Sequence, residues 1–345
     1  MFISVLMSGG VDSSVAAALL LAAGHEAEGV TFRLWGADSD TENAVSTAAD
    51  TCRLLGMPHR AIDLRKQFSE GIISYFINSY AAGETPNPCV FCNPAIKFGA
   101  ALDACIAAGS EMVATGHYVR IGRGPDGGYE LLRAADAKKD QSYFLHRLGQ
   151  AQLSRIIFPL GGMTKDDVRA EARRLGLPAA ESGESQEVCF IPDDDYRGFM
   201  EKMRPGLAAG GEFVDASGMV LGRHRGTAFY TVGQRKGLGV SSPLGRRYVL
   251  KRDSATGRIV LGSEEDLLKD GCTVRDVNWV SGAAPRGEFR AGVRLRYRSA
   301  EVPSTIYPQE MNARIVFDRP DPGVSPGQSA VFYDGEKVLG GGVIE

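Results

Sequence analysis

Two groups of residues in this chain have the types and the spacing that covalent chemistry requires. The first is Ser-Gly-Gly-Val-Asp-Ser at 8–13, which follows an apolar run and precedes a helical pattern. Its glycines let the backbone turn so that N–H groups and serine hydroxyls face phosphate oxygens at the start of a helix. No Gly-Lys-Ser/Thr is present, so this is not the P-loop of kinases. The segment predicts a pyrophosphate-binding loop. The structural alternative is a plain strand–turn–helix connection in which Asp12 caps the helix.

The second group consists of three cysteines in two distant segments. Cys89 and Cys92 lie in TPNPCVFCNPAIKF at 85–98, and Cys189 lies in SQEVCFI at 185–191. A free cysteine is usually a small buried hydrophobic residue. The first segment, however, has prolines on both sides and little apolar pattern, which predicts a partly exposed loop in which a thiolate can react. Only the fold can bring Cys92 and Cys189 together.

Alternating elements would position these groups. Strand patterns at 2–7, 28–35, 59–64 and 111–116 alternate with helical patterns at 15–24, 44–56, 67–80 and 97–109. This alternation is typical of a parallel sheet wrapped by helices. A hairpin is expected at 118–134, with its turn at Asp126-Gly127. After about residue 205 short β-rich runs replace the helical pattern, and from about 271 they predict a small barrel or sandwich.

Composition excludes several classes of protein. The chain of 345 residues is 43% hydrophobic and 23% charged, which is ordinary for a globular protein. We expect no apolar stretch to approach the length of a membrane span, and the start MFISVLMSGG lacks the features of a secretory signal. These observations predict a cytoplasmic protein without membrane association. Six scattered cysteines do not make a disulfide scaffold, so paired cysteines indicate catalysis or metal binding.

The charge is distributed unevenly. Between Gly222 and Arg258 nine Lys or Arg residues face one acid, a local charge of +8 that leaves −11 for the rest of a chain whose total is −3. A second cluster contains Arg286, Arg290, Arg294, Arg296 and Arg298. Such runs are either solvated faces or footprints for a phosphate backbone.

Ordered motifs along the whole chain identify a family. They are MSGGVDSSV, TPNPCVFCNPAIKFG, ATGHY, KDQSYFL, FPLG, SQEVCFI and TVGQRKGLG. With them the chain resembles, end to end, the bacterial tRNA-specific 2-thiouridylases of the ATP pyrophosphatase (PP-loop) superfamily. The resemblance implies an α/β fold class with three parts: a Rossmann-like PP-loop domain with a parallel sheet at 1–204, a small β-rich central domain at 205–268, and a C-terminal β-barrel at 269–345.

The resemblance also implies a sulfurtransferase activity. The enzyme would adenylate the 2-carbonyl of the wobble uridine, position 34 of tRNA, and replace its oxygen by sulfur, giving 2-thiouridine, AMP and pyrophosphate. It implies ATP and Mg²⁺ as cofactors, and tRNA and a sulfur-donor protein or sulfide as partners. The alternative is another PP-loop adenylating ligase, acting on RNA or on a small amide substrate. A third interpretation is a non-catalytic RNA-binding or redox-sensing protein that keeps a vestigial loop.

Individual roles follow from the resemblance. Cys92 would be the nucleophilic or resolving cysteine, and Cys189 would carry the incoming sulfur as a persulfide, with a Cys92–Cys189 disulfide as one end state. The nucleotide would be bound by Leu6, Met7, Ser8, Gly9, Gly10, Val11, Asp12, Ser13, Phe32 and Gly116. The tRNA would be contacted by Asn87, Pro88, Cys89, His117, Lys139, Asp140, Gln141, Arg296, Tyr297 and Gln328.

The chain departs from the family pattern at three places. Phe32 stands where Met typically lines adenine, and Glu184 and Glu187 stand where Asp and Gly often precede the sulfur-carrying cysteine. Cys89 stands where many members have Asp. The resulting Cys-x-x-Cys pair leaves two routes open. In one, sulfur travels on a Cys189 persulfide; in the other, Cys89, Cys92 and Cys189 hold an iron–sulfur cluster whose open iron binds the transferred sulfide.

Overall fold

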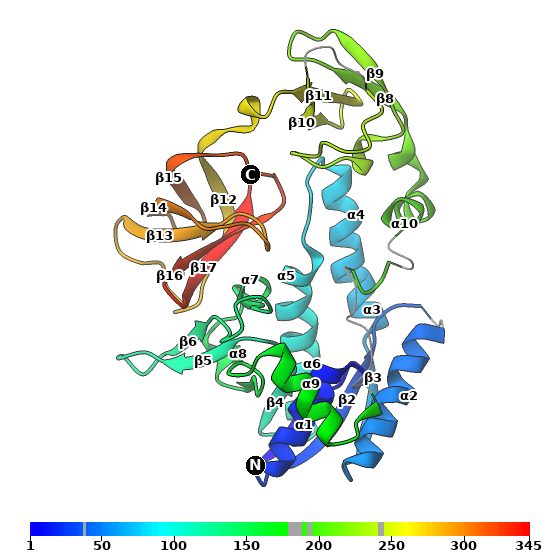
Figure 1. Cartoon of the computed structure of the whole chain (residues 1–345), viewed down its shortest axis with the longest axis vertical. Helices are drawn as coiled ribbons and strands as arrows, with labels where there is room; N and C mark the ends of the chain where they lie inside the picture. The colour runs from blue at the N-terminus through cyan, green and yellow to red at the C-terminus, as the bar shows by residue number, and fades with distance from the viewer. Residues whose placement is uncertain (37–38, 179–187, 192–194, 241–244) are drawn as a thin grey trace.

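The chain folds around three β-sheets, seen in a computed structural model that describes residues 1–36, 39–178, 188–191, 195–240 and 245–345. Figure 1 shows the N-terminal α/β part at one end, a small sheet at the other, and a C-terminal barrel beside them. The predicted order of an α/β domain, a β-rich central part and a β-barrel is confirmed.

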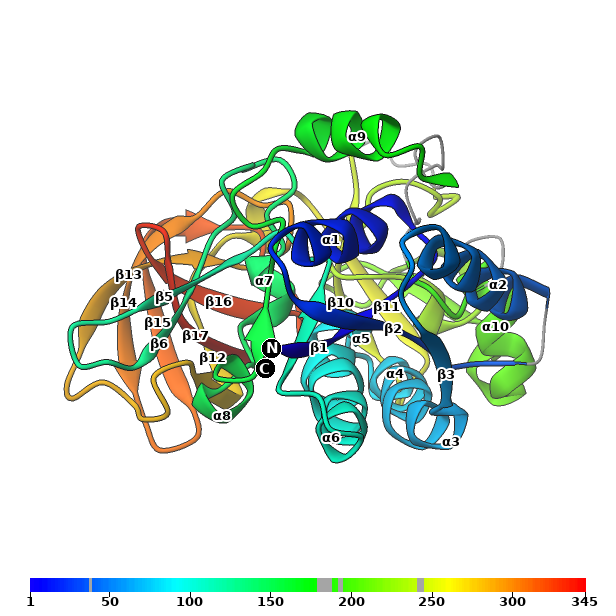
Figure 2. The ribbon, with the colours of Figure 1, turned by 90° about the horizontal axis from the view of Figure 1, so that it is seen from below.

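The first sheet is parallel and has the strand order β3-β2-β1-β4-β7. Its strands are β1 (Phe2–Leu6), β2 (Glu26–Arg33), β3 (His59–Asp63), β4 (Met112–Thr115) and β7 (Ile156–Ile157). One face carries α1 (Val11–Ala22), α2 (Ser39–Leu54) and α9 (Lys165–Arg174), and the other carries α3 (Arg65–Phe68) and α6 (Ala101–Ala107) (Figure 2). Beyond α3, α4 (Ser74–Ala81) runs away from the sheet toward the central part (Figure 1). The strand order reverses at β1. Open α/β sheets bind ligands beyond the carboxyl ends of strands at such a point, here between the segments that follow Leu6 and Thr115.

A 20-residue helix, Pro88–Ala107, runs beneath this edge, and we call it the cysteine helix. It joins α5 (Pro88–Cys92), the π-helical segment η2 (Asn93–Ala100) and α6. The prediction of a loop around Cys89 and Cys92 was wrong from residue 88 onward, because a proline in the first helical turn loses no hydrogen bond and favours helix initiation.

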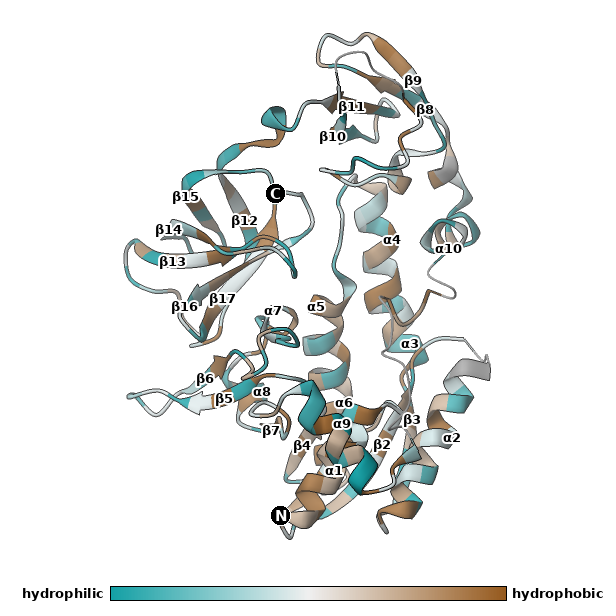
Figure 3. Ribbon diagram, in the orientation of Figure 1, coloured by the Kyte–Doolittle hydropathy of each residue, from teal (hydrophilic) through white to brown (hydrophobic). Residues whose placement is uncertain are grey.

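The cysteine helix also corrects the expectation about apolar length. By length and composition, with a mean hydropathy of 1.4, it would suffice to cross a membrane. Its apolar residues lie instead against the sheet. Val90, Phe98 and Leu102 share a buried cluster with Leu6 of β1 and Val113 of β4. Figure 3 shows how apolar residues concentrate along α1, α4 and α5.

The predicted hairpin forms from β5 (Arg120–Arg123) and β6 (Tyr129–Leu132), with Gly127 at φ +80° in its turn. Its place was not predicted. β6 pairs antiparallel with β17 (Lys337–Ile344), so the hairpin extends the sheet of the C-terminal barrel.

The remaining strands form the central sheet and the barrel. The central sheet has the order β10-β11-β8-β9, from β8 (Gly211–Val214), β9 (Val220–His224), β10 (Tyr248–Asp253) and β11 (Arg258–Gly262). Residues 226–233, which belong to the region predicted to be β-rich, form no strand there but contain a 3₁₀ turn, Thr227–Phe229. The barrel comprises β12 (Lys269–Trp279), β13 (Phe289–Arg294), β14 (Val302–Pro308), β15 (Ala313–Asp321), β16 (Ser329–Asp334) and β17. It closes because β12 pairs with both β15 and β17, so the barrel alternative holds and the sandwich does not.

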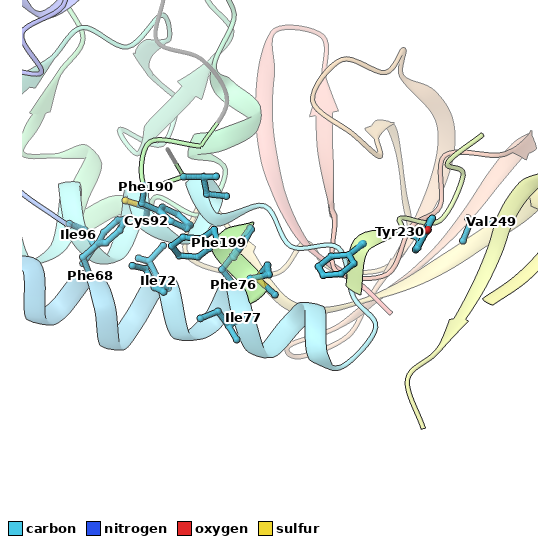
Figure 4. Close-up of a cluster of buried hydrophobic side chains, with 14 of the residues drawn as sticks. Phe68, Ile72, Phe76, Ile77, Cys92, Ile96, Phe190, Phe199, Tyr230 and Val249 are labelled. Atoms are coloured by element: carbon cyan, nitrogen blue, oxygen red, sulfur yellow. The ribbon is translucent and has the colours of Figure 1, made fainter. Parts of the chain in front are cut away.

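One hydrophobic cluster unites the α/β domain with the central part. Phe68 and Phe76, from the helices beneath the sheet, pack with Phe190 and with Phe199 of α10 (Tyr196–Met203) (Figure 4). Cys92 belongs to the same cluster, which places it next to the segment that contains Cys189.

Candidate active site

The phosphate loop, residues 8–13, turns between β1 and α1. Gly9 has φ +78°, a conformation that favours glycine, and Gly10 is the N-cap residue of α1. The Ser13 and Ser14 hydroxyls both donate to the Gly10 carbonyl, at 3.1 and 2.9 Å. The loop therefore lies at a helix start, where backbone N–H groups favour an anion.

Gly116, directly after β4, touches this loop. A Cβ at Gly116 would lie 2.6 Å from the carbonyl carbon of Asp12 and 2.7 Å from the nitrogen of Ser13. Only glycine allows this approach, which joins the two segments that follow β1 and β4. The side chains of Leu6, Met7 and Val11 are buried, so these residues can offer only backbone atoms to a nucleotide. Phe32, half-buried near the end of the neighbouring strand β2, packs at the edge of the core.

Asp12 does not cap its helix. Its carboxylate accepts hydrogen bonds from Lys165 Nζ at 2.6 and 2.8 Å and from the Tyr118 hydroxyl at 2.7 Å. Lys165, at the start of α9, is only 7% exposed. The capping alternative is therefore wrong, because Gly10 is the N-cap residue and has no side chain. Sequence reasoning missed the Lys165 partner because it lies 153 positions away.

The three cysteines gather near one another around the cysteine helix. Cys89 is half-buried, Cys92 is 7% exposed, and Cys189 is exposed as a residue; all three are free thiols. Burial is the main cause that raises the pKa of each, that of Cys92 to about 12. The charge of Cys89 also raises the pKa of both other thiols, so the three are within electrostatic reach. The expected partial exposure holds for Cys89 but not for Cys92.

These thiols do not form a metal-binding group as they stand. Within the described ranges, no three His, Cys, Asp or Glu side chains lie together in a way that could hold a metal ion. Residues 184–187 before Cys189, where the sequence departs from the family pattern, lie outside the described residues.

A lysine links the cysteine helix to the phosphate loop. Lys97 Nζ lies 3.4 Å from His117 Nε2, and His117 Nδ1 lies 2.8 Å from the Thr115 hydroxyl. Burial, and then the charge of Lys97, holds the pKa of His117 well below its usual range. The ring is therefore neutral, so its Nε2 accepts from Lys97 while its Nδ1–H donates to Thr115. Lys97 stands in the IKF motif, but sequence reasoning gave it no role.

Several residues predicted to contact tRNA lie at joints between the domains. Gln328 donates from Nε2 to the Thr85 carbonyl at 2.9 Å and so holds the barrel against the segment before Asn87, the N-cap residue of α5. Arg296 donates to the Val232 carbonyl in the central part at 3.2 Å.

The KDQ segment mixes internal and accessible groups. Asp140 is 5% exposed and accepts from the Ala134 and Ser142 N–H groups, so its carboxylate serves the fold. Gln141 accepts from the Tyr118 N–H at 2.9 Å, and Lys139 is half-buried.

An aromatic pair lies beside the cysteine helix. The Tyr297 ring lies 4.3 Å from the ring of Phe144, measured between centroids, and the Phe144 carbonyl accepts from Asn93 Nδ2 at 3.0 Å. The structure thus brings Tyr297 toward the helix of Cys89 and Cys92.

The two basic clusters differ in their partners. Arg235, Arg246 and Arg247 line a groove of about 600 Å³ in the central part, and Lys236 beside them is exposed. In the second cluster, Arg290 pairs with Asp318, and Arg294 pairs with Asp140 and Glu301. Part of the second cluster therefore neutralises acids of the fold itself.

Comparison with known proteins gives consistent matches along the chain. Three family models match in order: a tRNA methyl transferase HUP domain at residues 1–193, a tRNA methyl transferase PRC-barrel domain at 197–263, and an aminomethyltransferase beta-barrel domain at 269–344.

Curated relatives match over nearly the full chain. A protein of Chloroflexus aurantiacus named tRNA-specific 2-thiouridylase MnmA is 47% identical over 99% of this chain and 97% of its own length. Proteins of the same name from Geobacter metallireducens and Pelobacter propionicus are 45% and 47% identical, over 99% and 100% of this chain and 96% and 97% of their own lengths. A solved 4-thiouridine synthetase–RNA complex with bound ATP covers 59% of this chain and 50% of its own at 20% identity, with a TM-score of 0.35.

Proposed function

Because the chain belongs to the family of tRNA-specific 2-thiouridylases, we propose that it is the sulfurtransferase that converts uridine 34 of tRNA to 2-thiouridine with ATP. One structural observation carries the proposal. Gly116 touches the phosphate loop, and its neighbour His117 contacts Lys97 on the cysteine helix. The phosphate loop, which would bind the ATP that activates the uracil oxygen, is therefore linked through Gly116 and His117 to the cysteine helix, which would take part in sulfur delivery. This link lies at the point where the strand order of the sheet reverses. We expect the enzyme to act in the cytoplasm, where its tRNA substrate is found.

The first step is adenylation. The uracil 2-oxygen attacks the α-phosphorus of ATP, a P–O bond breaks, and pyrophosphate leaves with the bonding electrons. The phosphate loop stabilises the charge on the phosphates through backbone N–H groups at the start of α1. Magnesium would accompany the nucleotide, but both oxygens of Asp12, the only carboxylate of this loop, are bound by Lys165. The loop therefore offers the metal no free carboxylate.

The second step replaces the oxygen. A Cys189 persulfide, loaded by a sulfur-donor protein or from sulfide plus an oxidant, attacks the 2-carbon with its terminal sulfur, and AMP leaves with the former uracil oxygen. The Cys92 thiolate then attacks the Cys189 sulfur. The S–S bond to the transferred sulfur breaks, its electron pair completes the 2-thiocarbonyl, and a Cys92–Cys189 disulfide forms. A thiol reductant must return this disulfide to two thiols before the next turnover.

The target base must leave the anticodon stack to reach this site, at a cost of about a few kcal/mol. We propose that Asn87, Pro88 and Cys89 line the extruded base, because they begin the cysteine helix. We propose that the flanking nucleotides are contacted by Tyr297, Arg296, Gln328, Lys139 and Gln141.

The activity test measures 2-thiouridine in tRNA from a deletion strain that expresses a variant. Wild type and Cys272→Ser, a control in the barrel, should restore the nucleoside. Cys92→Ser and Cys189→Ser should abolish it while ATP affinity changes by less than about threefold, because each thiol has its own chemical step. Full thiolation by either serine variant would remove that cysteine from the mechanism.

The iron–sulfur route has a separate test. Three thiolates suit such a cluster chemically, although the described residues do not assemble them into a ligand group. Protein purified without oxygen should be analysed for iron and acid-labile sulfide, with Cys89→Asp as the control. Iron-free protein that thiolates tRNA from a persulfide donor establishes the persulfide route. Iron and activity that are lost together in Cys89→Asp would replace it by the cluster route.

A further inference from the structure

Lys97 lies in the candidate active site, but the proposed steps at the two cysteines and the phosphate loop give it no role. It is half-buried in the middle of the cysteine helix, and its Nζ contacts the neutral ring of His117. His117 follows Gly116, which touches the phosphate loop. The ammonium group therefore lies between the segment that would hold ATP and the helix that bears Cys89 and Cys92.

The π-helical segment η2 sets the direction of Lys97. Cys92 and Lys97 are five positions apart, and in an α-helix of 3.6 residues per turn their side chains would point roughly 140° apart. The i→i+5 hydrogen bonds of a π-helix bring residues five apart close to one face. Two residues favour this local geometry. Pro94 has no N–H to donate, and a Cβ at Gly99 would lie 2.7 Å from the Pro94 carbonyl oxygen. π-Segments of this kind are frequent at functional sites.

The charge of Lys97 has no carboxylate counter-ion in the part of the chain that the structure describes. A half-buried charge without a partner is costly unless another group uses it. Besides His117, its charge acts on three sulfur atoms. Among the described residues, Lys97 is the cation that lowers the pKa of Cys92, and it acts in the same direction on Cys89 and Cys189. The positive charge is therefore directed at the place where sulfur would carry negative charge.

From this placement we propose that Lys97 is a catalytic residue of sulfur transfer, whose ammonium group donates hydrogen bonds to the anionic sulfur as it attacks the adenylated 2-carbon. The inference rests on the proposed thiolation. Lys97 stays protonated and forms no covalent bond, and His117 accepts one of its hydrogens and fixes its direction. A positioned cation favours the ionised, nucleophilic form of the sulfur over its protonated form. We expect this to be worth about 10²–10³ in rate, the size of the effect of removing one preorganised donor.

The experiment separates adenylation from sulfur transfer in a single turnover. Wild type, Lys97→Met, Lys97→Gln and Lys97→Arg are each mixed with ATP, an unmodified tRNA transcript and a persulfide donor. Pyrophosphate release and 2-thiouridine are followed in the same samples. Lys66→Met, which removes an exposed lysine on α3, is the matched control. We expect the neutral variants to form 2-thiouridine about 100-fold more slowly with pyrophosphate release within about threefold. Lys97→Arg should form 2-thiouridine about tenfold faster than the neutral variants, because it keeps the positive charge.

Three results would overturn the inference. The first is a neutral variant that thiolates tRNA at the wild-type rate. The second is a loss of pyrophosphate release, in both neutral variants, as large as their loss of 2-thiouridine formation. The third is a Lys97→Arg variant that thiolates no faster than Lys97→Met. An equal loss would assign Lys97 to the nucleotide or to the fold. If the wild-type protein releases pyrophosphate but forms no 2-thiouridine, the proposed function itself fails, and the role of Lys97 fails with it.

Discussion

Replacing Lys165 by methionine should destabilise the α/β domain, since it removes the cation that binds the phosphate loop at Asp12. Methionine keeps most of the apolar length of the side chain and removes the two hydrogen bonds at 2.6 and 2.8 Å. The stranded carboxylate keeps one donor, the Tyr118 hydroxyl.

The size of the effect follows from burial. Breaking a fully buried ion pair by removing one partner costs about 3–5 kcal/mol. The Lys165 side chain is 9% exposed, but that of Asp12 is 34% exposed, so water partly solvates the carboxylate that is left. We therefore expect the free energy of unfolding to fall by about 2 kcal/mol. Asp12→Asn in the Lys165→Met background should cost less than it does alone, with a coupling energy of about 1–2 kcal/mol.

Tryptophan fluorescence can report this domain alone. The chain has two tryptophans, Trp35 and Trp279, and the second lies in the barrel. A Trp279→Phe background leaves Trp35, whose ring lies 6.0 Å from that of Phe199. Urea unfolding of the four members of the cycle gives the coupling energy. A coupling energy below about 0.5 kcal/mol would show that the Lys165–Asp12 ion pair does not stabilise the folded domain. It would refute the expectation that burial makes this pair important for stability.

Two further predictions concern charge. Replacing Arg235, Lys236, Arg246 and Arg247 by glutamine should weaken tRNA binding and flatten the plot of log affinity against log salt by about one unit per residue, and an unchanged slope would make them a solvated face. His146 is fully buried, its Nδ1 lies 2.8 Å from the Tyr143 carbonyl oxygen, and burial lowers its pKa to about 3. The unfolded chain takes up this proton near pH 6.5 and the folded chain only near pH 3, so the free energy of unfolding should fall by up to about 1.4 kcal/mol per unit as pH drops through that window. His146→Gln should remove this part of the slope in urea titrations from pH 7 to 4, and an unchanged slope would contradict it.

Local signals made the sheet and the phosphate loop predictable. The strands β1 to β4 and the helices α1 and α2 carry their own periodicity, and the glycines at 9 and 10 mark the turn between β1 and α1. The proposed catalytic pair of Cys92 and Cys189 depended on a family resemblance, because the 97 positions between them carry no local signal of proximity.

Long-range contacts account for what sequence reasoning missed. The Lys165–Asp12 pair and the pairing of β6 with β17 join segments more than 150 positions apart. The start of the cysteine helix was read as a loop because Pro88, Pro94 and Asn87 are turn residues by composition, whereas position makes Pro88 a helix initiator. Lys97 was passed over because its direction depends on a π-helical turn, which periodicity of 3.6 residues does not reveal.

The pairing of the β5–β6 hairpin with β17 means that the enzyme cannot be dissected at the boundary near residue 204. A fragment ending there would expose the edge of β6, whose N–H and C=O groups at Leu131 and Leu132 pair with Val338 and Lys337 in the intact chain. Unpaired edges of this kind recruit other strands and lead to aggregation. The α/β domain and the barrel are therefore not separable folding units. Any circular permutation or transfer of either part to another protein must keep the β5–β6 hairpin together with β17.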